Sequence, residues 1–209
     1  WMMDNWIYSG NATVRFRYEG AGKFARDGTI TRGQWGITQD DTGRLYYNSN
    51  SDPLRIDAVP SAYLRRNPNF TATATNVKVT PARLPTFPGR VTPGINRGYN
   101  SLDQAGKLMS VTAACGPVIY RGGLFPAEFR GDAFIAEPSG NLIKRIKLAE
   151  KDGAVTGTNA YGSVTAASNG ISVTSAGGSF TINASEDRGY QAQSALSGIE
   201  RSALNSGGE

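Results

Sequence analysis

The sequence of 209 residues contains no histidine and a single cysteine, Cys115. These two absences exclude an intrachain disulfide, a CxxCH haem attachment and a zinc site built from cysteine and histidine. They also exclude catalysis that uses an imidazole as its base. Cys115 lies beside apolar residues in "TAACGPVIY", and we expect a small buried thiol rather than a nucleophile, because no partner base is present.

Long hydrophobic runs are absent as well. No apolar stretch is long enough to span a bilayer, and the sequence shows no transmembrane segment and no signal peptide. The chain opens with Trp1 in "WMMDNW" rather than with methionine, so we expect a fragment of a longer protein.

Basic residues are in excess but scattered, and the formal net charge is +5. Close groups occur at Arg65-Arg66 and in "KRIK" (144–147), which is too little for a basic patch, so we expect no nucleic-acid partner. In "NLIKRIKL" (141–148) the charges fall on both alternating faces, which predicts an outer or edge strand.

Helical periodicity is almost absent, and the sequence predicts an all-β protein. Short alternating apolar runs end at Gly, Asp, Asn or Pro, and 26 glycines and 10 prolines indicate many turns. A short helix is predicted around "VPSAYLRR" and a long proline-rich loop over residues 81–94. Strands are predicted over residues 5–10, 13–19, 34–40, 44–50, 76–80, 117–122, 132–137 and 141–148.

The composition changes near residue 153. From there on, more than half of the residues are Gly, Ser, Ala or Thr, and large apolar residues are rare. We therefore divide the chain into residues 1–152 and a loosely ordered tail, 153–209. Within the tail, residues 170–184 predict a hairpin about Gly177-Gly178.

A weak internal repeat is visible. "DNWIYSGN" and "GDAFIAEP" both align with "GRLYYNSN", which places Trp6 and Ala133 on Leu45. A turn, an apolar strand and polar residues that recur every ~40–45 residues are typical of β-propeller blades. A β-sandwich is the alternative architecture.

The stretches "PGINRGYN" and "TAACGPVIYRGGLFPAEFRGDAFIAEPSGNLIKRIKL" carry a family resemblance. They resemble the β-propellers of soluble pyrroloquinoline quinone (PQQ) sugar dehydrogenases of the glucose/sorbosone type. They are also similar to large membrane-associated dehydrogenase-like propellers. The similarity covers roughly residues 1 to 160 and implies a partial propeller of about four blades. Such an open arc would need the missing blades of its parent protein or would self-associate.

The run "NSNSD" follows an apolar strand without a break. In a propeller the innermost strands end at a central funnel where ligands bind, which predicts that these polar residues, with Arg55, form a rim. The alternative is that Asn, Ser and Asp close a turn through their side chains.

The resemblance implies PQQ and calcium as cofactors. Arginine forks pair with carboxylates such as those of PQQ, and calcium takes oxygen ligands. The metal ligand predicted in this way is Asp52. The predicted cofactor-binding residues are Asn48, Asn50, Arg55, Arg97, Arg121 and Glu137. No catalytic residue is predicted, because the family is thought to use a histidine base and this chain has none.

Two functions follow as expectations. The resemblance implies an oxidoreductase-type propeller related to PQQ-dependent sugar or alcohol dehydrogenases, periplasmic or extracellular, in which this chain is not catalytic alone. The alternative is a non-catalytic propeller that binds a carbohydrate or a protein, or serves as a scaffold. The missing histidine favours the alternative for this chain.

Overall fold

The fold is known from a computed structural model, which describes residues 2–69, 74–81, 84, 86, 111–139, 142–167, 170–175 and 178–182. Within these ranges the protein is all-β, as predicted. It has one α-helical turn, α1 (Ser61–Leu64), and one 3-10 turn, η1 (Ala127–Phe129). No helix in the described ranges is long and apolar enough to cross a membrane.

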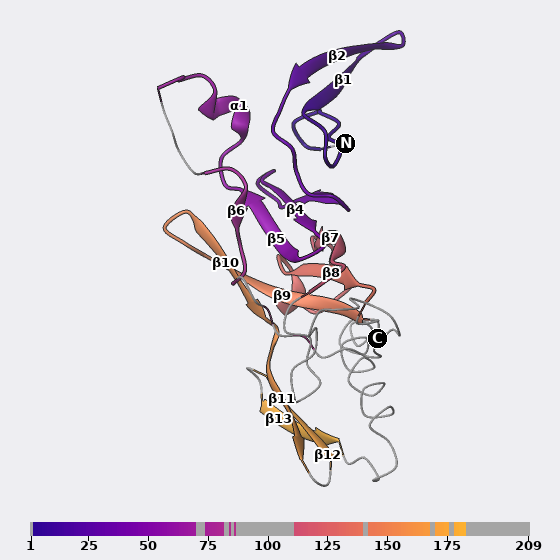
Figure 1. Cartoon of the computed structure of the whole chain (residues 1–209), viewed down its shortest axis with the longest axis vertical. Helices are drawn as coiled ribbons and strands as arrows, with labels where there is room; N and C mark the ends of the chain where they lie inside the picture. The colour runs from indigo at the N-terminus through magenta and orange to yellow at the C-terminus, as the bar shows by residue number, and fades with distance from the viewer. Residues whose placement is uncertain are drawn as a thin grey trace, which may run out of the picture.

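The strands form four antiparallel sheets that follow one another along the chain (Figure 1). In every sheet, strands that are consecutive in sequence are neighbours in space. The first sheet contains β1 (Val14–Gly20) and β2 (Lys23–Gly28). The second contains β3 (Ile37–Gln39), β4 (Leu45–Ser49), β5 (Asp52–Asp57) and β6 (Val77–Lys78). The third contains β7 (Cys115–Ile119), β8 (Ala133–Glu137), β9 (Leu142–Lys151) and β10 (Ala154–Asn159), and the fourth β11 (Tyr161–Ala167), β12 (Gly170–Ser175) and β13 (Gly178–Ile182).

The second and third sheets share one hydrophobic core. Within the strands its buried side chains come from alternate positions, as the two-residue period of a strand requires, and residues outside the strands complete it. Burial of these apolar faces is the main force that holds the two sheets together. The cluster contains Tyr46, Leu54, Ile56, Val79, Leu84, Val111, Ala114, Ile119, Ala133, Ile135, Ile146 and Val155.

The two sheets also meet along both of their edges. On one side, the Gly116 N–H at the start of β7 donates to the Trp35 carbonyl just before β3, at 3.1 Å. A Cβ on Gly36 would lie 2.7 Å from Pro117 Cδ, so a side chain there would block this approach. On the other side, the Gly157 N–H in β10 donates to the Val79 carbonyl at 2.7 Å. The first strands of the two sheets therefore lie side by side, and so do the last.

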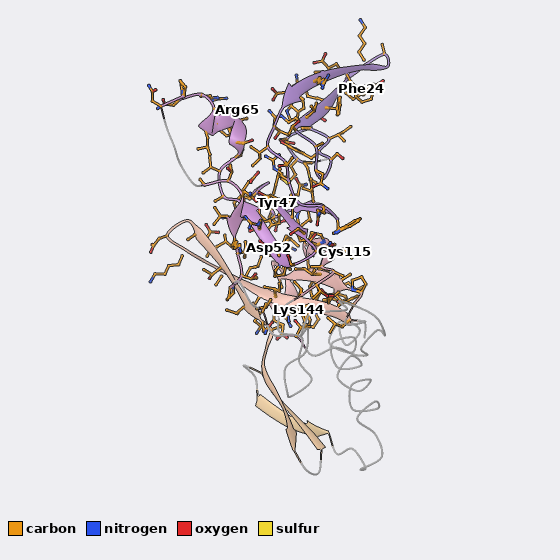
Figure 2. The ribbon with its side chains drawn as sticks, viewed as in Figure 1. Phe24, Tyr47, Asp52, Arg65, Cys115 and Lys144 are labelled. Atoms are coloured by element: carbon orange, nitrogen blue, oxygen red, sulfur yellow. The ribbon has the colours of Figure 1, made fainter. Side chains whose placement is uncertain are left out.

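The other face of the second sheet turns toward the first sheet. Tyr47, labelled in Figure 2, donates its hydroxyl to Asp57 Oδ1 at 2.8 Å, and Asp57 Oδ2 accepts from Arg32 Nε at 2.6 Å. The Arg32 guanidinium lies 5.0 Å from the centre of the Tyr8 ring, which precedes β1. A buried, hydrogen-bonded ion pair thus joins the segment that follows the first sheet to the second sheet.

The repeat seen in the sequence is confirmed in part. Leu45 and Ala133 each open the second strand of a four-stranded sheet. The strand predicted for the third copy of the repeat, residues 5–10, is wrong. This segment contributes only a single bridge, between Ile7 and Phe16. Asn5 and Asn11 have positive φ values of 64° and 59°, so the extended backbone is interrupted on both sides of this segment.

Pro53 is the second residue of β5. Tyr47 pairs with Arg55 and Ser49 pairs with Asp52, so Asn48 faces two residues of β5 instead of one. This β-bulge tolerates a proline because the bulged position lies outside the regular ladder of hydrogen bonds.

The edge-strand prediction for residues 141–148 is wrong. β9 lies between β8 and β10, and Lys144 and Arg145 are only 3% and 7% exposed. Arg145 tolerates burial because its Nε donates to Asp132 at 2.6 Å and its guanidinium lies 3.7 Å from the centre of the Phe129 ring. The alternation of apolar and charged residues in β9 does not show that its charges are paired. Because they are paired, β9 can lie inside the sheet.

The segment after residue 152 contributes strands. β9 and β10 form a hairpin across the expected boundary, with Lys151 opposite Ala154. β12 and β13 form a hairpin inside the predicted range 170–184, with Ser175 opposite Gly178. Residues 183–209 lie outside the described residues.

Candidate functional site

Four segments converge where β4 turns into β5. They are residues 34–36, 48–50, 112–114 and 137–139, and we call this region the polar end. The Ala114 N–H donates to the Asn50 carbonyl at 3.0 Å, and the Ala113 N–H donates to Glu137 Oε2 at 3.3 Å. The polar end therefore joins loops of the second and third sheets.

An exposed tryptophan is fixed at the polar end. Trp35 is 56% exposed, and its indole Nε1–H donates to Asn50 Oδ1 at 2.5 Å. The Asn50 N–H in turn donates to Gln34 Oε1 at 3.2 Å. A ring held in this way presents an aromatic surface to solvent without losing side-chain entropy when a ligand stacks on it.

Asn48 lies beside this group but is fully buried. Neither its amide nitrogen nor its amide oxygen has a hydrogen-bond partner within the described part of the chain. Its backbone carbonyl accepts from the Gln34 N–H at 2.8 Å, and Gly33, with φ of +52°, packs directly against it. Buried polar groups without partners are rare in native proteins and call for an explanation.

Glu137 is buried at the same end and is already engaged. Its carboxylate accepts from the N–H groups of Thr112 at 3.2 Å and of Ala113, and from the Ser139 hydroxyl. These bonds fasten the segment before β7 to the end of β8. Glu137 thus serves as an anchor for the polar end rather than as an available base.

Asp52 and Arg55 lie at the same end of the second sheet but belong to its other face. Arg55 pairs with Tyr47 across the strands and donates through Nε to Asp52 Oδ2 at 2.6 Å. Lys78 Nζ lies 3.9 Å from the same oxygen. Two cations surround this carboxylate, and the described residues hold no cluster of three acidic or metal-ligating side chains, so they do not fit the predicted calcium site.

Arg121 lies at the opposite end of β4, next to the β3–β4 turn. Its Nε donates to Asp41 Oδ1 at 2.7 Å, and it lines a pocket with Arg44 and Tyr46. Arg97 lies outside the described residues. The structure therefore brings Asn48, Asn50 and Glu137 together, but it does not add Arg121 to them, and the described residues offer no arginine clamp for PQQ at the polar end.

Cys115 begins β7 near this end and is half-buried. Burial raises the pKa of its thiol, and the negative charge of Glu137 raises it further. The thiol is therefore protonated at neutral pH, and a protonated thiol is a poor nucleophile.

Sequence reasoning missed Gln34, Trp35, Thr112 and Ser139. The "QWG" stretch was predicted to be part of a strand, and alternation alone does not tell an exposed tryptophan from a core one. The available signal was Gly36, since a glycine inside a predicted strand often marks a site where a ligand or another backbone approaches closely.

Searches of curated proteins and of solved structures each found no match to the chain. A family model described as "Domain of unknown function (DUF7133)" matches residues 1–169. This match spans the first three sheets and β11. The chain belongs to the DUF7133 family.

Proposed function

We propose that the second and third sheets are two consecutive blades of a β-propeller, and that the first and fourth sheets are parts of two more. The support is geometric: both are four-stranded meanders, they pack face to face, and their first strands lie side by side. Propeller blades are likewise four-stranded sheets packed around a central axis.

We further propose that this chain is a carbohydrate-binding module without catalysis of its own. The observation that carries this proposal is the exposed Trp35 indole, held in place by Asn50. A fixed aromatic face suits the C–H face of a sugar ring, and neighbouring side-chain amides suit its hydroxyl groups, because an amide both donates and accepts. Gln34 and Asn50 would supply these amide contacts.

Binding is favoured over the oxidoreductase hypothesis for chemical reasons. A sugar dehydrogenase needs a base near the substrate hydroxyl, and the chain contains no histidine. The Glu137 carboxylate is occupied by three donors, and Arg121 lies at the other end of the sheets. The oxidoreductase hypothesis remains a prediction.

Calorimetric titration of the whole chain with cellohexaose, xylohexaose and laminarihexaose tests the proposal. We expect at least one of these neutral oligosaccharides to bind, and Trp35→Ala to weaken its binding about tenfold or more, as loss of a stacking contact of roughly 1–2 kcal/mol would do. Phe24→Ala is the matched control, because Phe24 is also 56% exposed but lies on the first sheet, far from the polar end (Figure 2). Absence of binding by all three sugars, or equal binding by Trp35→Ala, would reject it.

A further inference from the structure

A pocket lies at the end of the sheets opposite the polar end. Its volume is about 230 Å³. The β3–β4 turn forms one side, β9 and β10 form the other, and Tyr46 and Ile119 contribute apolar surface. We call it the charged pocket. It is lined by Asp40, Asp41, Thr42, Arg44, Tyr46, Ile119, Arg121, Gly131, Leu148, Ala149, Glu150 and Val155.

The charges around this pocket are paired across the two sheets. Arg44 donates through Nε to Asp40 at 2.7 Å and through Nη2 to Glu150 on β9 at 2.8 Å. Asp41 accepts from Arg121 at 2.7 Å and from Arg130 at 3.0 Å. Three guanidinium groups thus face three carboxylates, and their formal charges cancel.

These pairs hold the side chains in place without using all of their hydrogen-bonding capacity. Within the described part of the chain, the Nη1 groups of Arg44 and Arg121 and the Oε1 atom of Glu150 have no protein partner. The hydrogen bond from Arg44 lowers the pKa of Glu150, and the bonds from Arg121 and Arg130 lower that of Asp41. Both carboxylates are therefore ionised and able to accept at neutral pH.

Asp40 differs from its neighbours in the pocket. Its two oxygens accept from the backbone and hydroxyl of Thr42, from the backbone and guanidinium of Arg44, and from the Tyr46 hydroxyl. It is saturated and shapes the turn. The groups that remain for a ligand are therefore fixed guanidinium donors next to a fixed carboxylate acceptor.

We propose that the charged pocket binds a neutral polyhydroxylated molecule no larger than one sugar ring. Each hydroxyl both donates and accepts, so adjacent hydroxyls can bond an arginine and a carboxylate at the same time. The balanced charge gives no advantage to an anion, and the volume is below the usual range for larger ligands. Apolar surface from Tyr46, Leu148 and Val155 suits the C–H groups of such a ring.

This inference goes beyond the proposed function, because the pocket shares no residue with the polar end. The test is a titration of the ¹⁵N-labelled chain with glucose and with glucuronate, followed by NMR. We expect glucose to shift backbone resonances of residues 40–44 and 148–150, and glucuronate to bind no more tightly. Arg121→Gln and Glu150→Gln should each weaken glucose binding about tenfold, because each removes a charge-assisted hydrogen bond.

Two controls separate this site from the polar end and from general effects of charge. Trp35→Ala should leave the glucose shifts at residues 40–44 unchanged, and so should Arg17→Gln, which removes an exposed arginine of the first sheet. Backbone spectra without ligand establish that each variant is folded. The proposal is overturned if glucose leaves these resonances unmoved, if glucuronate binds more tightly than glucose, or if neither pocket variant weakens binding.

Discussion

The Arg32 guanidinium and the Asp57 carboxylate lie 2.6 Å apart, and both side chains are almost completely buried. Asp57 also accepts from the Tyr47 hydroxyl and from the Asn76 N–H, and Arg32 also donates to the Ser61 hydroxyl. Every charge in this network thus has several partners. The pair joins the segment between the first two sheets to the last residue of β5 in the second sheet.

Asp57→Ala is therefore expected to destabilise the protein by about 3–5 kcal/mol, because it leaves the Arg32 charge buried without its partner. Urea unfolding measures this change. The matched control is Glu19→Ala, which breaks the exposed Arg17–Glu19 pair and should change the free energy of unfolding by less than about 1 kcal/mol. Similar effects of the two substitutions would contradict the role given to the buried pair.

Gly33→Ala is expected to destabilise the chain by about 2 kcal/mol or more. Its φ of +52° disfavours any side chain, and a Cβ there would lie 2.2 Å from the Asn48 carbonyl oxygen. Gly123→Ala is the control, since a Cβ at that position has nothing within 4 Å. A thermal unfolding midpoint that Gly33→Ala leaves unchanged would show that the contact between residues 33 and 48 is not formed.

Asp40 is expected to make stability depend on pH on the acid side. Burial alone would raise the pKa of Asp40, but hydrogen bonds from Thr42 and Arg44 outweigh it and hold the pKa below its ordinary value of 3.8. Between these two values the unfolded chain binds the proton more readily than the folded one, so stability falls as the pH falls through the folded pKa.

Urea unfolding between about pH 5 and pH 2 measures this effect. Asp40→Asn should lose stability at neutral pH and should show a shallower decline toward acid than the wild type. An identical slope in the two proteins would show that Asp40 does not titrate with a lowered pKa in the folded state.

Asn48→Leu is expected to stabilise the chain by about 1 kcal/mol, because the Asn48 amide is fully buried without a hydrogen-bond partner in the described part of the chain. A buried amide without partners costs free energy that an apolar side chain of similar size does not. Chemical denaturation measures this change, and a loss of stability would show that Asn48 is satisfied in the folded protein.

Much of the second and third sheets could be predicted from local pattern. The apolar runs that begin at Leu45 and Ala133 alternate, end at polar residues and align with each other, and both became second strands of their sheets. The glycine-containing stretch "GAG" (20–22) connects β1 to β2, and a polar stretch that begins at Asp40 connects β3 to β4. In each case the information lies within a few neighbouring residues.

The misses have a different cause, since they depend on partners far away in sequence. Arg145 could not be recognised as buried without Asp132 and Phe129 on neighbouring elements. Arg121 follows β7 and therefore lies at the end of the third sheet beside the β3–β4 turn. A family pattern gives only the position of Arg121 in the sequence. The direction of β7 decides at which end of the third sheet Arg121 lies.

The polar end contains residues that could be predicted from local pattern and residues that could not. Asn48 and Asn50 were predicted from the composition of one run, whereas Trp35 became a candidate only through its hydrogen bond to Asn50 and its exposure. Glu137 was predicted to bind a ligand, but the backbone of residues 112 and 113 takes up its carboxylate. Such capture by backbone N–H groups cannot be read from a sequence.

The most direct test of the account follows the indole N–H resonances of the three tryptophans, Trp1, Trp6 and Trp35, in the ¹⁵N-labelled chain during titration with cellohexaose, xylohexaose and laminarihexaose. The Trp35 resonance is assigned by its loss in Trp35→Phe. We predict that at least one of these sugars shifts the Trp35 resonance until it saturates, and leaves that of Trp6 in place. A Trp35 resonance that stays unmoved by all three sugars would contradict carbohydrate binding at the polar end.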